Sequence, residues 1–101
     1  MPVPFATVYS RDSHFQRHGQ AVGAVDSADY ERMADDFMFG AMNVNTRECR
    51  RKNLDFVRLD FVTAHFGVSA LPRVLKTFFI AGPFRVSAQD FFNFECRRTN
   101  L

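Results

Sequence analysis

The sequence predicts an α+β fold in which two N-terminal helices pack on an antiparallel sheet of three or four strands and a short C-terminal helix follows. Apolar residues recur at helical spacing through the first forty residues, and they alternate with polar residues from about residue 47 to residue 80. We expect the helices to pack on one face of the sheet. The 101 residues form a single domain over 1–101.

Local signals define the two N-terminal helices. Residues 1–8, which include two prolines, are expected to form an extended lead-in. Apolar side chains at helical spacing predict the first helix over residues 9–22, with Gly23 at its exit. The Asp-Ser pair at 26–27 offers an N-cap for a second helix, which Gly40 ends.

The second half of the chain changes to the period of β-strands. A charged edge strand is expected at 47–51, a second strand at 54–62, and further strands at 66–68 and 74–80, with a turn at 69–73 between the last two. Alternation within the second strand places Leu54, Phe56 and Arg58 on one face and Val57, Leu59 and Phe61 on the other.

A stop signal and a cap predict the final helix. Gly82 and Pro83 end the last strand, and Ser87 caps a short helix with Asp90 near its N-terminus. The phenylalanines at 91, 92 and 94 are the side chains expected to pack.

Composition excludes some classes of protein and leaves others open. The longest apolar run is far shorter than the ~20 residues that span a bilayer, so no membrane insertion is expected, and the start lacks the features of a signal peptide. The net charge is only +2, and 11 of the 13 cationic residues are arginines. Cations cluster at 47–52 and 97–98, and acids cluster at 26–36. A nearly neutral chain can therefore carry a positive face and a negative face, and this distribution is compatible with a nucleic-acid partner.

Two cysteines, Cys49 and Cys96, lie 47 positions apart and form no metal-binding or redox motif. One disulfide between them is conceivable. Their apolar or strand-like neighbours favour buried free thiols instead.

A cluster of basic side chains occupies the first predicted helix. His14 and His18 stand one turn apart on one helical face, Arg11 shares that face, and Arg17 flanks it. One imidazole can accept a proton while another donates one, and arginine can bind a phosphate, which together suit acid–base chemistry at a phosphodiester. A purely structural histidine pair is the alternative. A zinc site with His65 is disfavoured because the glutamate of the H-E-x-x-H motif is absent and Arg17 lies beside the pair.

The strand at 74–80 carries a second candidate. Simple alternation places Arg73, Leu75 and Thr77 on one face, with Lys76 on the other. Thr77 lies in the middle of an apolar run, where its hydroxyl needs a partner. It is either an ordinary β-branched strand residue or a hydrogen-bond donor to a phosphate oxygen.

Several short motifs occur in a characteristic order along most of residues 12–97. They are residues 14–19 (HFQRHG), 23–24 (GA), 27–31 (SADYE), 34–37 (ADDF), 57–60 (VRLD), 66–68 (FGV), 76–79 (KTFF) and 93–96 (NFEC). With these motifs, the sequence resembles the toxin nuclease domains of the barnase, EndoU, colicin and RelE-like superfamily of metal-independent ribonucleases. It departs from them at residues 71–73, Leu-Pro-Arg, where members often have glycine before the strand, and at Phe79, where they often have tyrosine.

The resemblance implies attack of a ribose 2′-OH on the adjacent phosphate, which gives a 2′,3′-cyclic phosphate and a free 5′-OH without a metal or other cofactor. It implies that one of His14 and His18 acts as the base or the acid, that Arg17 binds or stabilises the phosphate and that Thr77 holds a non-bridging oxygen. Because the 2′-OH is the nucleophile, DNA is excluded as a substrate. The residues expected to bind substrate are Arg11, Arg58, Arg73 and Lys76.

The resemblance also implies a biological setting. Related domains form the tips of larger secreted effectors used in contact-dependent inhibition and Rhs-type competition between bacteria, where they act in the cytoplasm of the target cell. They usually cleave tRNA, and a cognate immunity protein blocks them. Two other functions remain open from the sequence: a non-catalytic RNA- or protein-binding domain on the same scaffold, and a structural domain that docks a partner through its phenylalanines.

Overall fold

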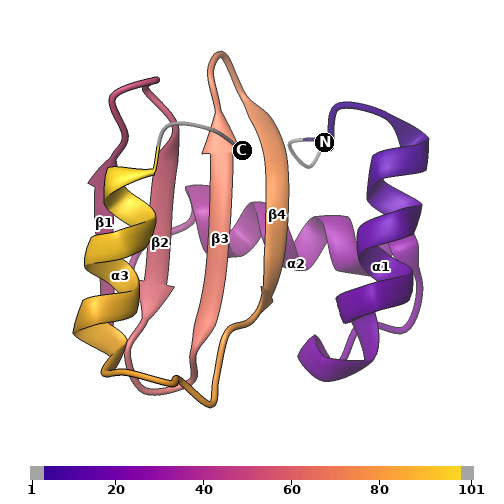
Figure 1. Cartoon of the computed structure of the whole chain (residues 1–101). Helices are drawn as coiled ribbons and strands as arrows, with labels where there is room; N and C mark the ends of the chain where they lie inside the picture. The colour runs from indigo at the N-terminus through magenta and orange to yellow at the C-terminus, as the bar shows by residue number, and fades with distance from the viewer. Residues whose placement is uncertain (1–3, 99–101) are drawn as a thin grey trace.

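The computed structural model describes residues 4–98 and confirms the predicted α+β architecture. The four strands form one antiparallel meander in the order β1-β2-β3-β4 (Figure 1). Among the described residues, no helix is long and apolar enough to cross a membrane. In chain order the elements are α1 (Val8–Val22), α2 (Ser27–Phe39), β1 (Thr46–Arg50), β2 (Phe56–Asp60), β3 (His65–Ala70), β4 (Val74–Ile80) and α3 (Ala88–Arg97).

The helix boundaries follow from the capping residues. The Thr7 side chain accepts a hydrogen bond from the Ser10 backbone and starts α1 one residue before the predicted position. Gly23 ends α1 in the left-handed conformation, with φ 82°, which suits glycine. Asp26 caps α2 in the same way by accepting from the Asp29 backbone. Of the predicted lead-in, residues 1–3 lie outside the described residues.

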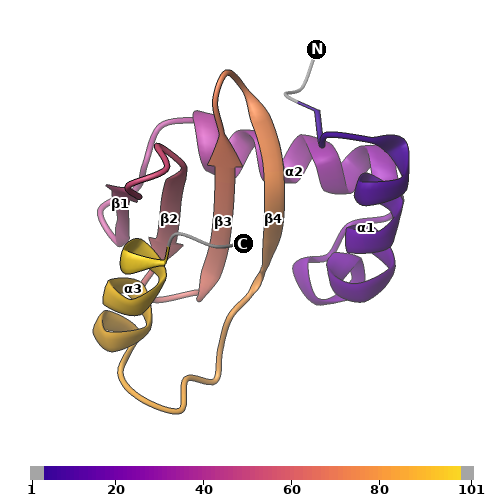
Figure 2. The same ribbon diagram turned by 45° about the horizontal axis from the view of Figure 1, so that its top comes forward.

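The sheet separates two apolar cores. The first, which joins α1 and α2 to the sheet, includes Tyr30 and Phe78, and the Tyr30 hydroxyl donates to the Phe78 carbonyl. The second lies under α3 and includes Val57, Leu59 and Phe92. The expectation that all helices share one face is therefore wrong, since α3 covers the face opposite α2 (Figures 1 and 2). Alternation along β2 gives the sheet an apolar side chain on each face, and both faces need a cover.

β4 departs from the simple alternation that the sequence predicted. Val68 pairs with Thr77 and Ser69 with Leu75, so Lys76 has no counterpart on β3 and forms a β-bulge. As a result, Lys76 and Thr77 line the same pocket, although the prediction had placed them on opposite faces. Leu75 contributes to the core with α1 and α2.

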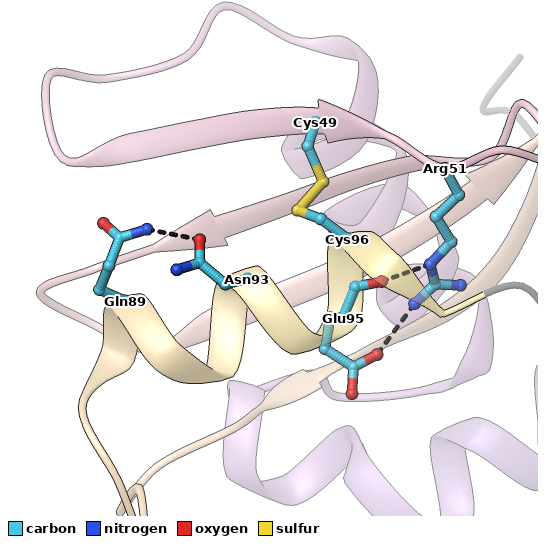
Figure 3. The surroundings of a disulfide bond; sticks show 6 residues. All are labelled: Cys49, Arg51, Gln89, Asn93, Glu95 and Cys96. Carbon is cyan, nitrogen blue, oxygen red and sulfur yellow. Dashed lines mark hydrogen bonds and ion pairs between the residues drawn. A yellow bond between two sulfur atoms is a disulfide. The ribbon is translucent and has the colours of Figure 1, made fainter.

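Cys49 and Cys96 form a disulfide, so the expectation of free thiols is wrong (Figure 3). Cys49 lies opposite Val57 in the β1–β2 pairing, and both contribute to the core under α3. Packing of α3 on this face brings Cys96 to the edge strand, with 6.0 Å between the two Cα atoms. The bond ties the C-terminal turn of α3 to β1.

Removing the disulfide is expected to lower the free energy of unfolding by about 2–4 kcal/mol, because it closes a loop of several tens of residues in the unfolded chain. The measurement is guanidinium unfolding of the wild type and of the Cys49→Ser/Cys96→Ser variant, each with and without a thiol reductant. The reductant should destabilise the wild type only. Equal midpoints for the oxidised wild type and the double variant would contradict the prediction.

Candidate functional site

A pocket of about 500 Å³ opens between α1, the strands β3 and β4, and the C-terminal end of α3. Phe66, Val68 and Phe79 give it apolar walls on the face of the sheet that also carries α3. The lining also includes six polar or charged residues, namely Ser10, His14, Lys76, Thr77, Glu95 and Arg98. Three of the residues predicted from the sequence, His14, Lys76 and Thr77, therefore meet in one place.

His14 is held in one orientation and one tautomer. Its Nδ1 lies 2.8 Å from the Ser10 carbonyl oxygen. A carbonyl only accepts hydrogen bonds, so Nδ1 carries the proton and Nε2 of the neutral ring has a free lone pair. The ring also stacks on Phe5, with 5.3 Å between centroids. His14 is thus a positioned proton acceptor on the pocket wall.

His18 lies one turn further along α1 and does not line the pocket. Its ring stacks on Phe79 at 5.0 Å and lies 6.2 Å from the ring of His14, measured between centroids. Burial lowers the pKa of His18, and electrostatic interactions with the neighbouring Arg17 and His14 lower it further. His18 therefore supports the neighbouring aromatic wall as a mainly neutral ring at pH 7.

The bulged segment of β4 supplies an amine and a hydroxyl to the pocket. The Lys76 ammonium is 2.7 Å from Asp55, whose side chain is almost fully buried. Within residues 4–98 the Thr77 hydroxyl has no hydrogen-bond partner. Thr77 is therefore available to a ligand, and Lys76 is held beside it by a buried carboxylate.

The buried guanidinium of Arg51 holds the side of the pocket that the C-terminal end of α3 forms. Arg51 Nε donates to the Glu95 backbone carbonyl at 2.6 Å, and Nη2 donates to the Glu95 carboxylate at 2.9 Å (Figure 3). The same carboxylate accepts two hydrogen bonds from Arg98, at 3.1 and 3.2 Å. Nη1 of Arg51 lies 3.8 Å from Asp55. Burial lowers the pKa of Arg51, and attraction to Glu95 and Asp55 opposes that shift.

These contacts form a chain of charges that ends at the pocket. Arg51 contacts two carboxylates, and each carboxylate also holds one cation of the pocket lining, Asp55 holding Lys76 and Glu95 holding Arg98. The network contains three cations, Arg51, Lys76 and Arg98, and two carboxylates, so its net charge is +1. This excess positive charge favours the binding of an anion in the pocket.

The other two predicted arginines of α1 are not part of the pocket lining. Arg11 pairs with its neighbour Asp12 at 3.1 Å. Arg17 is exposed, and its Nε donates to the Ser13 carbonyl at 3.3 Å. Helical spacing placed both arginines near the histidines, but their long side chains turn to these local partners on α1 instead of into the pocket.

Arg58 and Arg73 also lie away from the pocket. Arg58 donates to the carbonyls of Phe37 and Gly40 at the end of α2, on the opposite face of the sheet. The exposed Arg73 lies over the ring of Phe39, with 4.8 Å to its centroid. Arg58 therefore has a structural role, because it satisfies carbonyl groups that the end of a helix leaves without partners.

The three histidines weighed as a zinc site do not come together. The His65 ring contacts the rings of Phe37 and Phe78 on the α2 face, and its Nδ1 is 2.7 Å from the Thr63 hydroxyl. His14 and His18 contact other aromatic rings. In the part of the chain that the structure describes, no three His, Cys, Asp or Glu side chains are grouped to hold a metal ion.

Sequence reasoning missed Glu95, Arg98 and the buried Arg51. Two local features could have indicated an ion pair on the last helix. They are the two arginines at 97–98 and the spacing of three residues between Glu95 and Arg98. The contact between Arg51 and Glu95 joins residues 44 positions apart, and no local pattern indicates it.

Comparisons with known proteins add no family to this description. No protein-family model matches the chain, and no curated protein matches its sequence. The geometry of the pocket and the motif resemblance are therefore the two grounds for inferring its function.

Arg51→Met is expected to lower the free energy of unfolding by about 3–5 kcal/mol, because it leaves two buried carboxylates without their shared partner. The matched control is Arg11→Met, which removes a partly exposed pair and should cost less than about 1 kcal/mol. Urea unfolding of both variants at neutral pH is the measurement. A wild-type midpoint for Arg51→Met would show that the charge network adds no stability.

Stability is expected to fall as pH is lowered through the unfolded-state value of His18, near 6.5. The folded protein binds this proton less readily than the unfolded chain, so the contribution is complete above that pH and is lost below it. Urea unfolding at about pH 7.5 and about pH 5.5 should show a smaller loss for His18→Gln than for the wild type. Equal losses would contradict the lowered pKa.

Proposed function

We propose that this domain is a metal-independent endoribonuclease that cleaves RNA through attack of the 2′-OH on the adjacent phosphate. The products are a 2′,3′-cyclic phosphate and a free 5′-OH. One observation carries the proposal: a single pocket is lined by His14, Lys76, Thr77 and Arg98. These residues come from α1, from β4 and from the C-terminal end of α3, so only the folded chain brings them together. A proton acceptor, a hydroxyl and two cations are the groups that this transesterification uses.

The orientation of His14 supports a role as general base. Its free Nε2 takes the proton of the 2′-OH, the 2′ oxygen bonds to phosphorus, and the bond from phosphorus to the 5′ oxygen breaks. Because His18 does not line the pocket and its pKa is lowered, solvent supplies the proton to the departing 5′ oxygen. This assignment replaces the two-histidine scheme expected from the sequence.

The remaining groups stabilise the charge on the phosphate. Thr77 donates its hydroxyl to a non-bridging oxygen, while Lys76 and Arg98 offset the negative charge that grows in the transition state. The cations keep their positions without the substrate, since Asp55 and Glu95 already hold them. Preorganised charge of this kind needs little rearrangement when the reaction occurs.

The resemblance extends the proposal to a biological role. The substrate is tRNA, the domain is the toxic tip of a larger secreted effector, and a cognate immunity protein covers the pocket in the producing cell. The toxin acts in the cytoplasm of a competing bacterium. This part of the proposal rests on the motif resemblance alone.

The test is incubation of the purified protein with total bacterial RNA in EDTA. The wild type should give discrete fragments that end in 2′,3′-cyclic phosphate. His14→Gln should lower kcat by about 10²–10⁴-fold, and Thr77→Val by about 10²-fold or more. His65→Gln is the matched control, since His65 lies on the other face of the sheet and should keep wild-type activity.

Two results would overturn the proposal. Intact RNA with correctly folded wild-type protein would exclude the nuclease under these conditions, and RNA binding that persists in the same sample would favour a non-catalytic binding domain. Equal losses in His14→Gln and His65→Gln would separate the activity from this pocket.

A further inference from the structure

One end of the sheet gathers segments that are far apart in the chain. Because the sheet is an antiparallel meander, the β1–β2 and β3–β4 connections lie at the same end. The C-terminal turn of α3 ends there too, held by the disulfide and by Arg51 (Figures 1 and 3). We call this region the basic end and define it by its cations, which are Arg50, Arg51, Lys52, Arg73, Lys76, Arg97 and Arg98.

The basic end concentrates the positive charge of the molecule. Its seven cations stand against two carboxylates, Asp55 and Glu95, for a net charge of +5. The whole chain carries only +2, so the rest of the protein carries a net −3. A field of this kind attracts a polyanion to one end of the molecule, even though the overall charge is small.

Four of these cations present exposed charge, and two of them, Arg50 and Arg73, also lie over the aromatic rings of Phe56 and Phe39. Arg50, Lys52, Arg73 and Arg97 are exposed, and none of them has a carboxylate partner within residues 4–98. The two carboxylates of the basic end are buried and already contact Arg51 and the pocket cations. These four exposed positive charges repel one another, which disfavours gathering them at one end of the molecule unless a polyanion binds there.

The position and chemistry of the surface favour single-stranded RNA. The basic end adjoins the candidate pocket, which Lys76 and Arg98 line. The two connections are about 10 Å apart, or two strand spacings, so a strand can cross both of them. Phe94 is 55% exposed beside Arg98, and such an aromatic ring next to cations offers a stacking surface for a base.

We propose that the basic end binds the phosphates of RNA nucleotides next to the linkage held in the pocket. The inference rests on the proposed function and adds an extended binding surface to it. Arg50, Lys52, Arg73 and Arg97 contact flanking phosphates, and the pocket residues contact the one that reacts. Affinity then depends on the length of the RNA and on salt, because each neutralised phosphate releases counterions.

The test compares Lys52→Glu/Arg97→Glu with Arg85→Glu/Arg17→Glu. All four positions are exposed, so both variants change the same charge by the same amount, and Arg85 lies in the segment between β4 and α3, at the other end of the sheet. Binding of a fluorescent 20-nucleotide RNA with 2′-O-methyl riboses is measured by anisotropy over a range of salt. This RNA lacks the 2′-OH nucleophile, so binding is measured whether or not the protein cleaves RNA.

The Lys52→Glu/Arg97→Glu variant should weaken binding at least about tenfold and lower the salt slope by about 1.4, which corresponds to two single-strand phosphate contacts. The control variant should change both quantities much less. Equal effects in the two variants, or a wild-type slope in Lys52→Glu/Arg97→Glu, would overturn the inference. If the wild type cleaves RNA, KM for a 20-nucleotide substrate should rise in that variant while cleavage of a dinucleotide stays at the wild-type rate.

Discussion

The buried guanidinium of Arg51 is the interaction on which the arrangement of the pocket depends. It joins the β1–β2 connection to the last turn of α3 through Glu95, and it contacts Asp55 on the way into β2. A charge removed from water needs nearly complete compensation, so these groups have few alternative positions. Since Asp55 and Glu95 also hold Lys76 and Arg98, the position of one buried residue determines where two cations stand in the pocket.

The walls of the pocket are held by different forces. The disulfide and the Arg51 contacts fix α3 to the edge of the sheet. On the other side, aromatic packing places α1 against β4, with Phe5 between His14 and Tyr30 and with His18 on Phe79. The floor changes direction at the bulge on β4, which brings Lys76 to the side of Thr77. The candidate chemistry therefore depends on two helices, α1 and α3, that are held to the sheet by different contacts, and on a bulge in one strand of that sheet.

The same organisation explains why the small net charge was a poor guide to the surface. The acids of residues 26–36 lie on α2 and the segment before it, while seven of the 13 cations lie at the β1–β2 and β3–β4 connections and the C-terminal end of α3. The sequence clusters at 47–52 and 97–98 are adjacent in space because Cys49 and Cys96 are bonded. A strongly basic region thus coexists with a nearly neutral chain.

The sequence by itself determined the helices and strands. Their signals are the caps at Asp26 and Ser87, the glycines that end the first two helices, and the alternation in β2 that gives both faces of the sheet apolar side chains. These signals are local, because each acts between residues a few positions apart. The sequence also singled out His14, by its helical spacing from His18 beside two arginines, and Thr77, by its place in the middle of an apolar run. Only the tertiary structure decided the side of the sheet that α3 covers, the disulfide, the direction of Lys76 and the burial of Arg51. These features depend on contacts between residues tens of positions apart or on one bulge, and their energies arise only when the packed layers meet.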